Sequence, residues 1–158
     1  MRVTNRPSPN HSDRGGVAVD TIIIHSTAGG LEGALSWLCN PVSKVSAHYV
    51  ISRSGEIYKL VPLSRSAWHA GYCPGLPNAN RRSIGIELEQ LPEQSPTQAQ
   101  LDILKELIAQ IRRYFNIQRI VGHSEVNPRK RDPFHLDMNQ LRRDLGLSPA
   151  SPLATRGG

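Results

Sequence analysis

The sequence predicts an α/β protein, in which a central mixed β-sheet is flanked by helices in a single domain. The first observation is the order of elements: strand, helix, hairpin, strand, helix, strand, helix, which is typical of a mixed sheet with helices on its faces. The second is the length of 158 residues, which fits one domain with its own core. The third is that no internal repeat or second domain is visible. We expect a folded unit over 1–147 with an irregular arm (1–18), and a disordered tail (148–158).

The first half of the chain contains a buried strand, a short helix and a hairpin. Residues 18–25 ("AVDTIIIH") form a β-branched, nearly continuous apolar run, as expected for a buried strand. Residues 29–41 place three leucines on one helical face, with Pro41 just past the end. Residues 46–62 flank "RSGE", in which Gly55 supplies the backbone angle that a hairpin turn requires.

Two strands and two helices complete the order. We expect strands at 83–89 and 119–123. The segment 95–115 predicts the longest helix, with Ser95 as its N-cap and a glutamine three residues later completing a capping box. A last helix at 136–146 has an aspartate near its start and a glycine at its end, which are typical boundary residues.

Composition limits the functional classes. The net charge of +6 and a pI near 9.8 favour contact with polyanions, such as nucleic acid, anionic membranes or an anionic cell wall. However, the basic residues are scattered and no aromatic-interleaved basic stripe occurs, so nucleic-acid binding rests on the pI alone. No apolar run has the length of a membrane helix, and no apolar stretch follows the N-terminal charges. We therefore expect synthesis in the cytoplasm without a signal peptide, and no membrane insertion.

Two predicted strands end on histidines, His25 and His123, and Asp132 follows nine residues after the second one. Side chains at strand ends project into the loops where binding sites are built. Pro128 and Pro133 stiffen the loop around Asp132. Two neutral imidazoles and one carboxylate form a known Zn²⁺ ligand set, which leaves a fourth position open for water. The alternative is that each histidine only makes structural hydrogen bonds, which is the commoner role of a single histidine.

Six collinear segments carry a family resemblance over most of residues 6–133: "RPSPNHSDRGG", "IIIHSTA", "SAHYVISRSGEIYKLVP", "AWHAG", "NRRSIGIELE" and "GHSEVNPRKRDP". The chain resembles the zinc-dependent N-acetylmuramoyl-L-alanine amidases of the second type. That superfamily includes phage lysins, bacterial amidases that recycle cell-wall fragments, and animal peptidoglycan recognition proteins. The resemblance implies a central mixed sheet flanked by helices, one Zn²⁺, and hydrolysis of the amide between muramic acid and L-alanine, with 1–147 as the catalytic domain.

The resemblance also implies roles for single residues. The metal ligands are His25, His123 and Asp132, where the family has either aspartate or cysteine at the third position. The family's catalytic glutamate falls on Glu87 and its lysine on Lys130.

These residue types suit amide hydrolysis. Zinc lowers the pKa of bound water toward 7. Glu87 lies on an otherwise apolar strand, where burial raises the pKa of a general base into a useful range. Lys130 would stabilise the oxyanion, although in "RKR" it also reads as a solvated charge. Glu89 is the fallback base, because it faces the same side of the strand as Glu87.

Four further residues are expected to contact substrate. Trp68 and His69 belong to the family's groove loop, although Trp68 is equally well explained as a core residue. Asn80 and Arg81 are placed to hold the carboxylate of the stem peptide. His48 is expected beneath the site, hydrogen-bonded and supporting the sheet.

The preferred function is a bacteriolytic phage or prophage endolysin, which acts as a monomer on peptidoglycan in the host periplasm after release. The compact domain, the basic charge and the missing signal peptide favour it. One alternative is a cytosolic amidase that recycles anhydro-muropeptides, but those enzymes tend to carry a longer insertion than residues 26–45 after the first ligand. A second is a non-catalytic peptidoglycan-binding protein.

Overall fold

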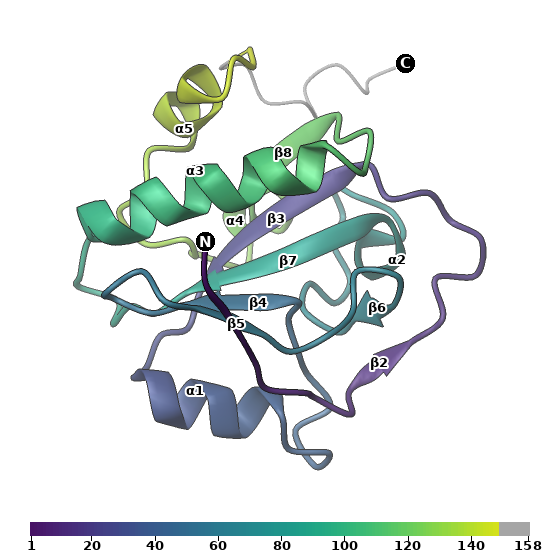
Figure 1. Cartoon of the computed structure of the whole chain (residues 1–158). Coiled ribbons are helices and arrows are strands. Elements are labelled where there is room, and N and C mark those ends of the chain that lie inside the picture. Colours follow the sequence, from purple (N-terminus) through teal and green to yellow (C-terminus); the bar gives the residue numbers. More distant parts are fainter. Residues whose placement is uncertain (149–158) are drawn as a thin grey trace.

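A computed structural model describes residues 1–148 of the chain (Figure 1). It confirms the predicted class, because one mixed sheet runs through the molecule and has helices on both faces. The expected tail lies outside the described residues, apart from Ser148. Among the described residues, no helix combines the length and the apolar character that crossing a membrane requires.

The main sheet has six strands in the order β1-β5-β4-β7-β3-β8. The β4–β5 pair is the predicted hairpin and is antiparallel, whereas the other neighbouring pairs are parallel. A separate antiparallel pair joins β2 to β6. The strands are β1 (Val3–Asn5), β2 (His11–Ser12), β3 (Thr21–Ser26), β4 (Tyr49–Ile51), β5 (Ile57–Lys59), β6 (Ser66–Ala67), β7 (Ser83–Leu88) and β8 (Arg119–Gly122).

Within residues 1–148, five helices accompany the strands, and α3 is the longest of them. In Figure 1, α3 crosses one face of the sheet in front of β3 and β7, while α1 lies beside the β4–β5 end. The helices are α1 (Leu31–Leu38), α2 (Ala79–Arg82), α3 (Gln98–Arg112), α4 (His123–Val126) and α5 (Met138–Asp144).

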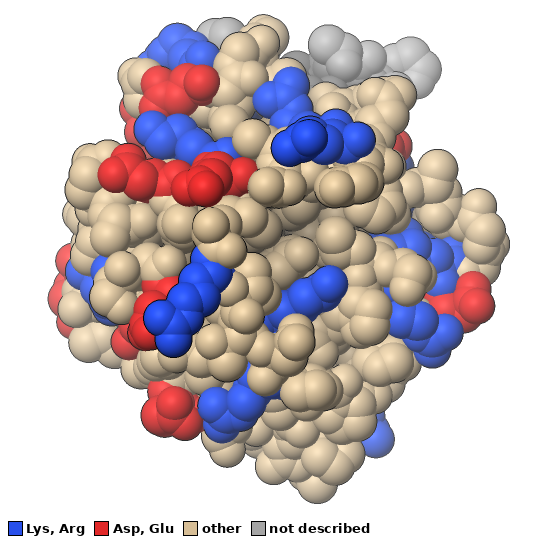
Figure 2. Space-filling view, in the orientation of Figure 1, with Lys and Arg blue, Asp and Glu red and all other residues tan. Residues whose placement is uncertain are grey.

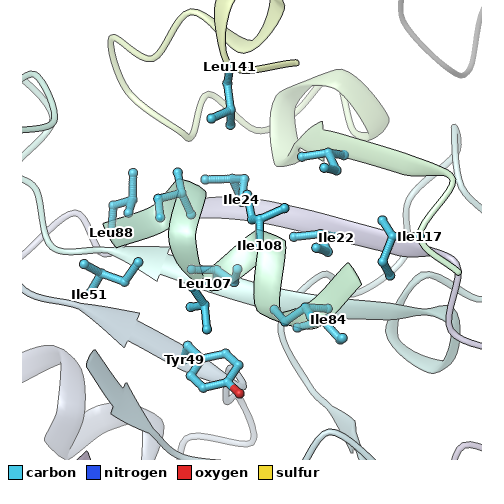
Figure 3. Packing of buried hydrophobic residues seen from close by; sticks show 14 of the residues in the cluster. Ile22, Ile24, Tyr49, Ile51, Ile84, Leu88, Leu107, Ile108, Ile117 and Leu141 are labelled. Carbon is cyan, nitrogen blue, oxygen red and sulfur yellow. The ribbon is translucent and has the colours of Figure 1, made fainter. Parts of the chain in front are cut away.

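The main core lies between α3 and one face of the sheet (Figure 3). Because successive side chains of a strand point to opposite faces, Ile22 and Ile24 of β3 pack under α3, where they meet Leu107 and Ile108. Ile23 belongs to a different cluster, on the other face. The same alternation sends the side chain of His25 to that other face, which is where the candidate site lies.

The N-terminal arm is more ordered than the sequence suggested. Residues 1–18 were expected to be irregular, but β1 extends the edge of the main sheet and β2 pairs with β6. Beyond β1, the backbone N–H groups of Arg6 and Ser8 donate to the carbonyls of Lys59 and Leu60. The side chains of β1 are exposed, so this strand has no apolar pattern from which it could be predicted.

The start of α3 also differs from the prediction. Thr97, not Ser95, is the N-cap, and its capping box is formed with Gln100. The buried Gln100 amide also donates to the carbonyls of Ile51 and Glu89, at 3.2 and 2.9 Å. These contacts with the sheet select the start of the helix, and local sequence alone does not show them.

Candidate metal centre

His25, His123 and Asp132 meet at one edge of the sheet. His25 lies near the end of β3, and His123 is the first residue of α4, directly after the neighbouring parallel strand β8. The Nδ1 atoms of His25 and His123 lie 3.1 and 3.3 Å from the same atom, Oδ2 of Asp132. One donor atom from each residue fits within a mutual distance of 4.8 Å, so the three can share one metal ion.

The hydrogen bond at the ring nitrogen of His123 that faces away from Asp132 shows whether this cluster suits a metal. Nε2 of His123 lies 3.1 Å from the carbonyl oxygen of Ala70, and a carbonyl only accepts, so Nε2 carries a proton. In the neutral ring, Nδ1 then directs a lone pair at the Asp132 carboxylate, which is itself an acceptor. Two facing acceptors repel each other unless a cation lies between them. The donor set therefore fits a divalent ion that takes imidazole and carboxylate ligands.

Asp132 is held in place by its backbone and by the residue after it. Its carbonyl accepts from the backbone N–H of Ser124, at 2.9 Å. Pro133 packs against Gly122, where an added Cβ would lie 2.7 Å from Pro133 Cδ. A side chain at position 122 would therefore push away the loop that carries the carboxylate.

The ionisable groups of the cluster shift one another's pKa values. Burial opposes ionisation of Asp132, but hydrogen bonds from His123 and His25 outweigh it and hold the pKa of Asp132 below its ordinary value. Burial also disfavours the charged form of His123, yet its contacts with Asp132 raise the pKa of His123 to about 9. These contacts favour positive charge on His123 and negative charge on Asp132, so the cluster attracts a cation.

Glu87 lies next to this cluster. It is the register partner of His25 on β7, and burial, reinforced by the charge of Asp132, raises its pKa to about 8. Glu89, the fallback, instead accepts from the backbone N–H of Arg53 at 2.9 Å. Of the two carboxylates, only Glu87 lines the pocket over the cluster.

That pocket has a volume of about 440 Å³. Its floor contains His25, His123, Asp132 and Glu87, and Lys130 lines it from the exposed loop before Asp132. A pocket of this size suits a small ligand rather than a single water.

Aromatic side chains form part of the pocket wall. Trp68 is half-buried, and its indole N–H donates to Ser12 Oγ at 3.1 Å while the residue lines the pocket. Trp37 of α1 was missed by the sequence analysis, although it also lines the pocket and is 54% exposed. The sequence pattern could have predicted this exposure, because the leucines of the helix face the core and the tryptophan lies on the other side.

Other predicted substrate residues lie differently. His69 does line the pocket, and its two ring nitrogens lie against His25 and Ser83. Asn80 and Arg81 are not brought to the pocket: Asn80 Oδ1 accepts from the backbone N–H groups of His69 and Ala70, and Arg81 is exposed beside Gly15. Their contact with a stem peptide stays a prediction. His48 is buried, and its Nδ1 accepts from the N–H of Gly85, so it lies within the sheet as expected.

Comparison with known proteins agrees with this geometry. The N-acetylmuramoyl-L-alanine amidase family matches residues 15–135. The 1,6-anhydro-N-acetylmuramyl-L-alanine amidase AmpD of Haemophilus influenzae is 43% identical over 96 residues, which are 57% of this chain and 52% of that protein. The N-acetylmuramoyl-L-alanine amidase AmiD of Escherichia coli is 29% identical over 136 residues, which are 72% of this chain and 48% of AmiD. The chain thus spans about half the length of these curated relatives.

Solved structures show the same fold. A crystal structure of an AmpD derivative superposes with a TM-score of 0.78 at 29% identity, and covers 89% of this chain and 93% of its own. Escherichia coli AmiD, solved with the substrate anhydro-N-acetylmuramic acid-L-Ala-D-γ-Glu-L-Lys, gives a TM-score of 0.73 at 27% identity, over 89% of this chain and 61% of its own. The resemblance that the sequence motifs carry is confirmed. The chain belongs to the N-acetylmuramoyl-L-alanine amidase family.

Proposed function

We propose that the chain hydrolyses the amide bond between N-acetylmuramic acid and L-alanine in 1,6-anhydro-muropeptide fragments, with Zn²⁺ held by His25, His123 and Asp132. The observation that carries this proposal is the convergence of two imidazole nitrogens and one carboxylate oxygen beneath a pocket that also exposes Glu87. A zinc ion there supplies Lewis-acid activation of water and of the amide carbonyl.

The remaining chemistry belongs to the protein's own side chains. Glu87 serves as the general base and then passes the proton to the leaving amine of L-alanine. Burial keeps the pKa of Glu87 near 8, and a cation beside it favours the ionised form that a base requires. Lys130, at the rim, offers a positive charge to the oxyanion of the tetrahedral intermediate. Trp37 and Trp68 offer apolar surfaces to the sugar or the peptide.

The comparisons favour the fragment-recycling alternative over the endolysin that the sequence analysis preferred. Relatives named for the 1,6-anhydro form share 43% identity with the chain. Endolysins also appear among the structural neighbours: one from Clostridium intestinale shares 19% identity, which supports the fold alone, and a mutant endolysin from Bacillus subtilis shares 26% with a TM-score of 0.62. We therefore propose fragment hydrolysis in place of the lytic role and of action in a host periplasm.

The charge distribution gives little support to nucleic-acid binding. On the face shown in Figure 2, Lys and Arg are dispersed among acidic and neutral residues instead of forming one stripe. Retention on DNA at moderate salt, with steep salt dependence, would be the outcome expected of that alternative.

Mass spectrometry of digests tests the proposal. Zinc-loaded protein is incubated in parallel with an anhydro-muropeptide and with intact peptidoglycan, with and without a chelator. We expect a new L-alanine amino terminus, faster release from the fragment, and loss of both reactions with chelator. Faster release from the polymer would favour the endolysin, and no release from either substrate would favour the binding-protein alternative.

A further inference from the structure

A chain of hydrogen bonds runs from the rear of His25 into the protein. Nε2 of His25 lies 2.9 Å from Nδ1 of His69. Nε2 of His69 lies 3.0 Å from the hydroxyl oxygen of Ser83. The Ser83 hydroxyl, in turn, contacts the backbone carbonyl of Ala79 at the start of α2. His69 therefore has a neighbour at each ring nitrogen, and both neighbours come from the protein.

The carbonyl at the far end fixes the direction of every bond in this chain. A carbonyl oxygen only accepts, so the Ser83 hydroxyl donates its one proton to Ala79. The Ser83 oxygen then accepts from His69, whose Nε2 must carry the proton. A neutral His69 is left with a bare Nδ1, which accepts from Nε2–H of His25. His25 therefore keeps its own Nδ1 unprotonated, on the side of Asp132.

We propose that His69 and Ser83 are positioning residues that hold His25 in the one tautomer able to bind a metal through Nδ1. This inference rests on the proposed role of His25 as a metal ligand. His69 also lines the pocket, so its expected contact with substrate stays a prediction beside this indirect role.

Space for the His69 ring depends on a glycine in β7. A Cβ at Gly85 would lie within 2.9 Å of three ring atoms of His69. Gly85 lies on the same face of β7 as Glu87, two residues further along, so the ring rests on the strand directly beside the candidate base. The glycine of "SIGIELE" is thus required by the neighbour of a metal ligand and not by a turn.

Asn80 supports the same arrangement from the backbone. Its Oδ1 accepts from the N–H groups of His69 and Ala70, at 3.2 and 2.8 Å. Ala70 also supplies the carbonyl that accepts from Nε2 of His123. One short segment therefore orients both histidines, His123 through a single carbonyl and His25 through a side-chain relay. Partners of this kind fix the tautomer of a ligand and raise its affinity for metal.

Zinc affinity, measured by competition with a chromophoric chelator, tests the relay without using catalysis. In His69→Leu the acceptor for His25 is lost, and we expect affinity to fall about tenfold to a hundredfold. In His69→Asn the amide oxygen can take the place of Nδ1, so affinity should fall much less than in His69→Leu. His11→Asn, in β2 and outside the cluster, is the matched control and should bind like wild type. Unchanged affinity in His69→Leu, or equal losses in both His69 variants, would overturn the proposal.

Histidine ¹⁵N spectra of the zinc-loaded wild-type chain give a second test that does not depend on how a variant folds. We expect His69 to be protonated at Nε2 and bare at Nδ1, and His25 to be protonated at Nε2. A proton on Nδ1 of His69 would overturn the relay even if the protein binds zinc and hydrolyses its substrate. Absence of zinc binding by the wild-type chain would instead overturn the proposed function, and the relay with it.

Discussion

The face of the sheet beneath α3 and the opposite face differ in chemistry, although the same strands build both. On β3 and β7, the isoleucines at 22, 24, 84 and 86 belong to the core beneath α3. The alternate positions along the two strands place His25, Gly85 and Glu87 on the other face. The first face is filled with apolar side chains, whereas the second combines smaller apolar clusters, around Ile23 and Val50, with buried histidines and a carboxylate whose pKa is raised to about 8.

This contrast separates stability from chemistry. Burial of apolar side chains stabilises the fold, whereas buried ionisable groups cost free energy unless they are paired. The ionisable groups of the second face can be tolerated because the core beneath α3 and the apolar clusters around Ile23 and Val50 stabilise the fold. Substitutions in the core beneath α3 should therefore change stability with little effect on the site, and substitutions of His25, Glu87 or Asp132 should chiefly change the site.

The largest effect is expected for Asp132→Ala. It removes the oxygen that lies 3.1 and 3.3 Å from the two histidine nitrogens. We expect stoichiometric zinc binding, and activity with it, to be lost while the circular dichroism spectrum is kept. Asp137→Ala is the matched control: it removes the N-cap of α5, costs about 1 kcal/mol of stability, and should leave zinc content unchanged. Wild-type zinc affinity in Asp132→Ala would refute the ligand assignment.

Glu87→Gln should keep both fold and metal but lose turnover. The amide has the same shape as the carboxylate and cannot accept a proton as a base does, so kcat should fall by about 10²–10⁴. Steady-state hydrolysis of an anhydro-muropeptide, with zinc content measured on the same sample, separates the two properties. Near wild-type kcat in the zinc-loaded variant would mean that another group acts as the base.

On the apolar face, Ile108→Ala should lower the free energy of unfolding by about 2–5 kcal/mol, because Ile108 is fully buried in α3 against the sheet. Chemical denaturation measures the loss. The kcat per folded molecule should equal that of wild type. If kcat falls as far as in Glu87→Gln, the two faces are not independent.

Acid should destabilise the fold partly through His48. Burial lowers the pKa of His48 to about 3 in the folded protein, whereas an unfolded histidine titrates near 6.5. Below pH 6.5 the unfolded state binds a proton that the folded state excludes, so stability is lost progressively between about pH 6.5 and 3. The loss should reach about 2 kcal/mol at pH 5. His48→Asn does not titrate, and its denaturation curves should show a shallower pH dependence over this window. If the stability of wild type and of His48→Asn depends equally on pH, His48 is not the cause of the acid destabilisation.

The smallest effect is expected for Lys130→Ala. Lys130 is exposed at the pocket rim, where solvent weakens its field, so kcat should fall by about tenfold, which is less than for a buried donor. Arg113→Ala, a basic residue at the end of α3, controls for the change in net charge. Unchanged turnover in Lys130→Ala would make it a surface charge only.

Sequence reasoning reached the elements that carry a strong local pattern. The isoleucine run of β3, the leucines of α1 and α3, and the glycine of the hairpin each specify their structure within a few residues. The spacing of the two strand-end histidines and Asp132 allowed a metal site, and the family resemblance selected His25, His123 and Asp132 as its ligands. The local elements could be predicted because they follow from the types and spacing of residues that are close together in the sequence.

The features that it missed depend on contacts between distant segments. Strand β1 forms through backbone pairing with β5, and its exposed side chains carry no pattern. Gln100 reaches the sheet only once α3 is docked. The position of His69 behind His25 requires the 67–71 segment to fold over Gly85, which nothing in the local sequence indicates.

The ligands of the candidate centre are far apart along the chain, and this separation affects how the protein is made. His25 and Asp132 are 107 residues apart, and β8, which brings His123 beside β3, ends at Gly122. During synthesis, the first ligand therefore leaves the ribosome long before its partners exist. Strand pairings with such separation form slowly, since a large loop must close first. A nascent chain can bring the three candidate ligands together only after Asp132 has been translated.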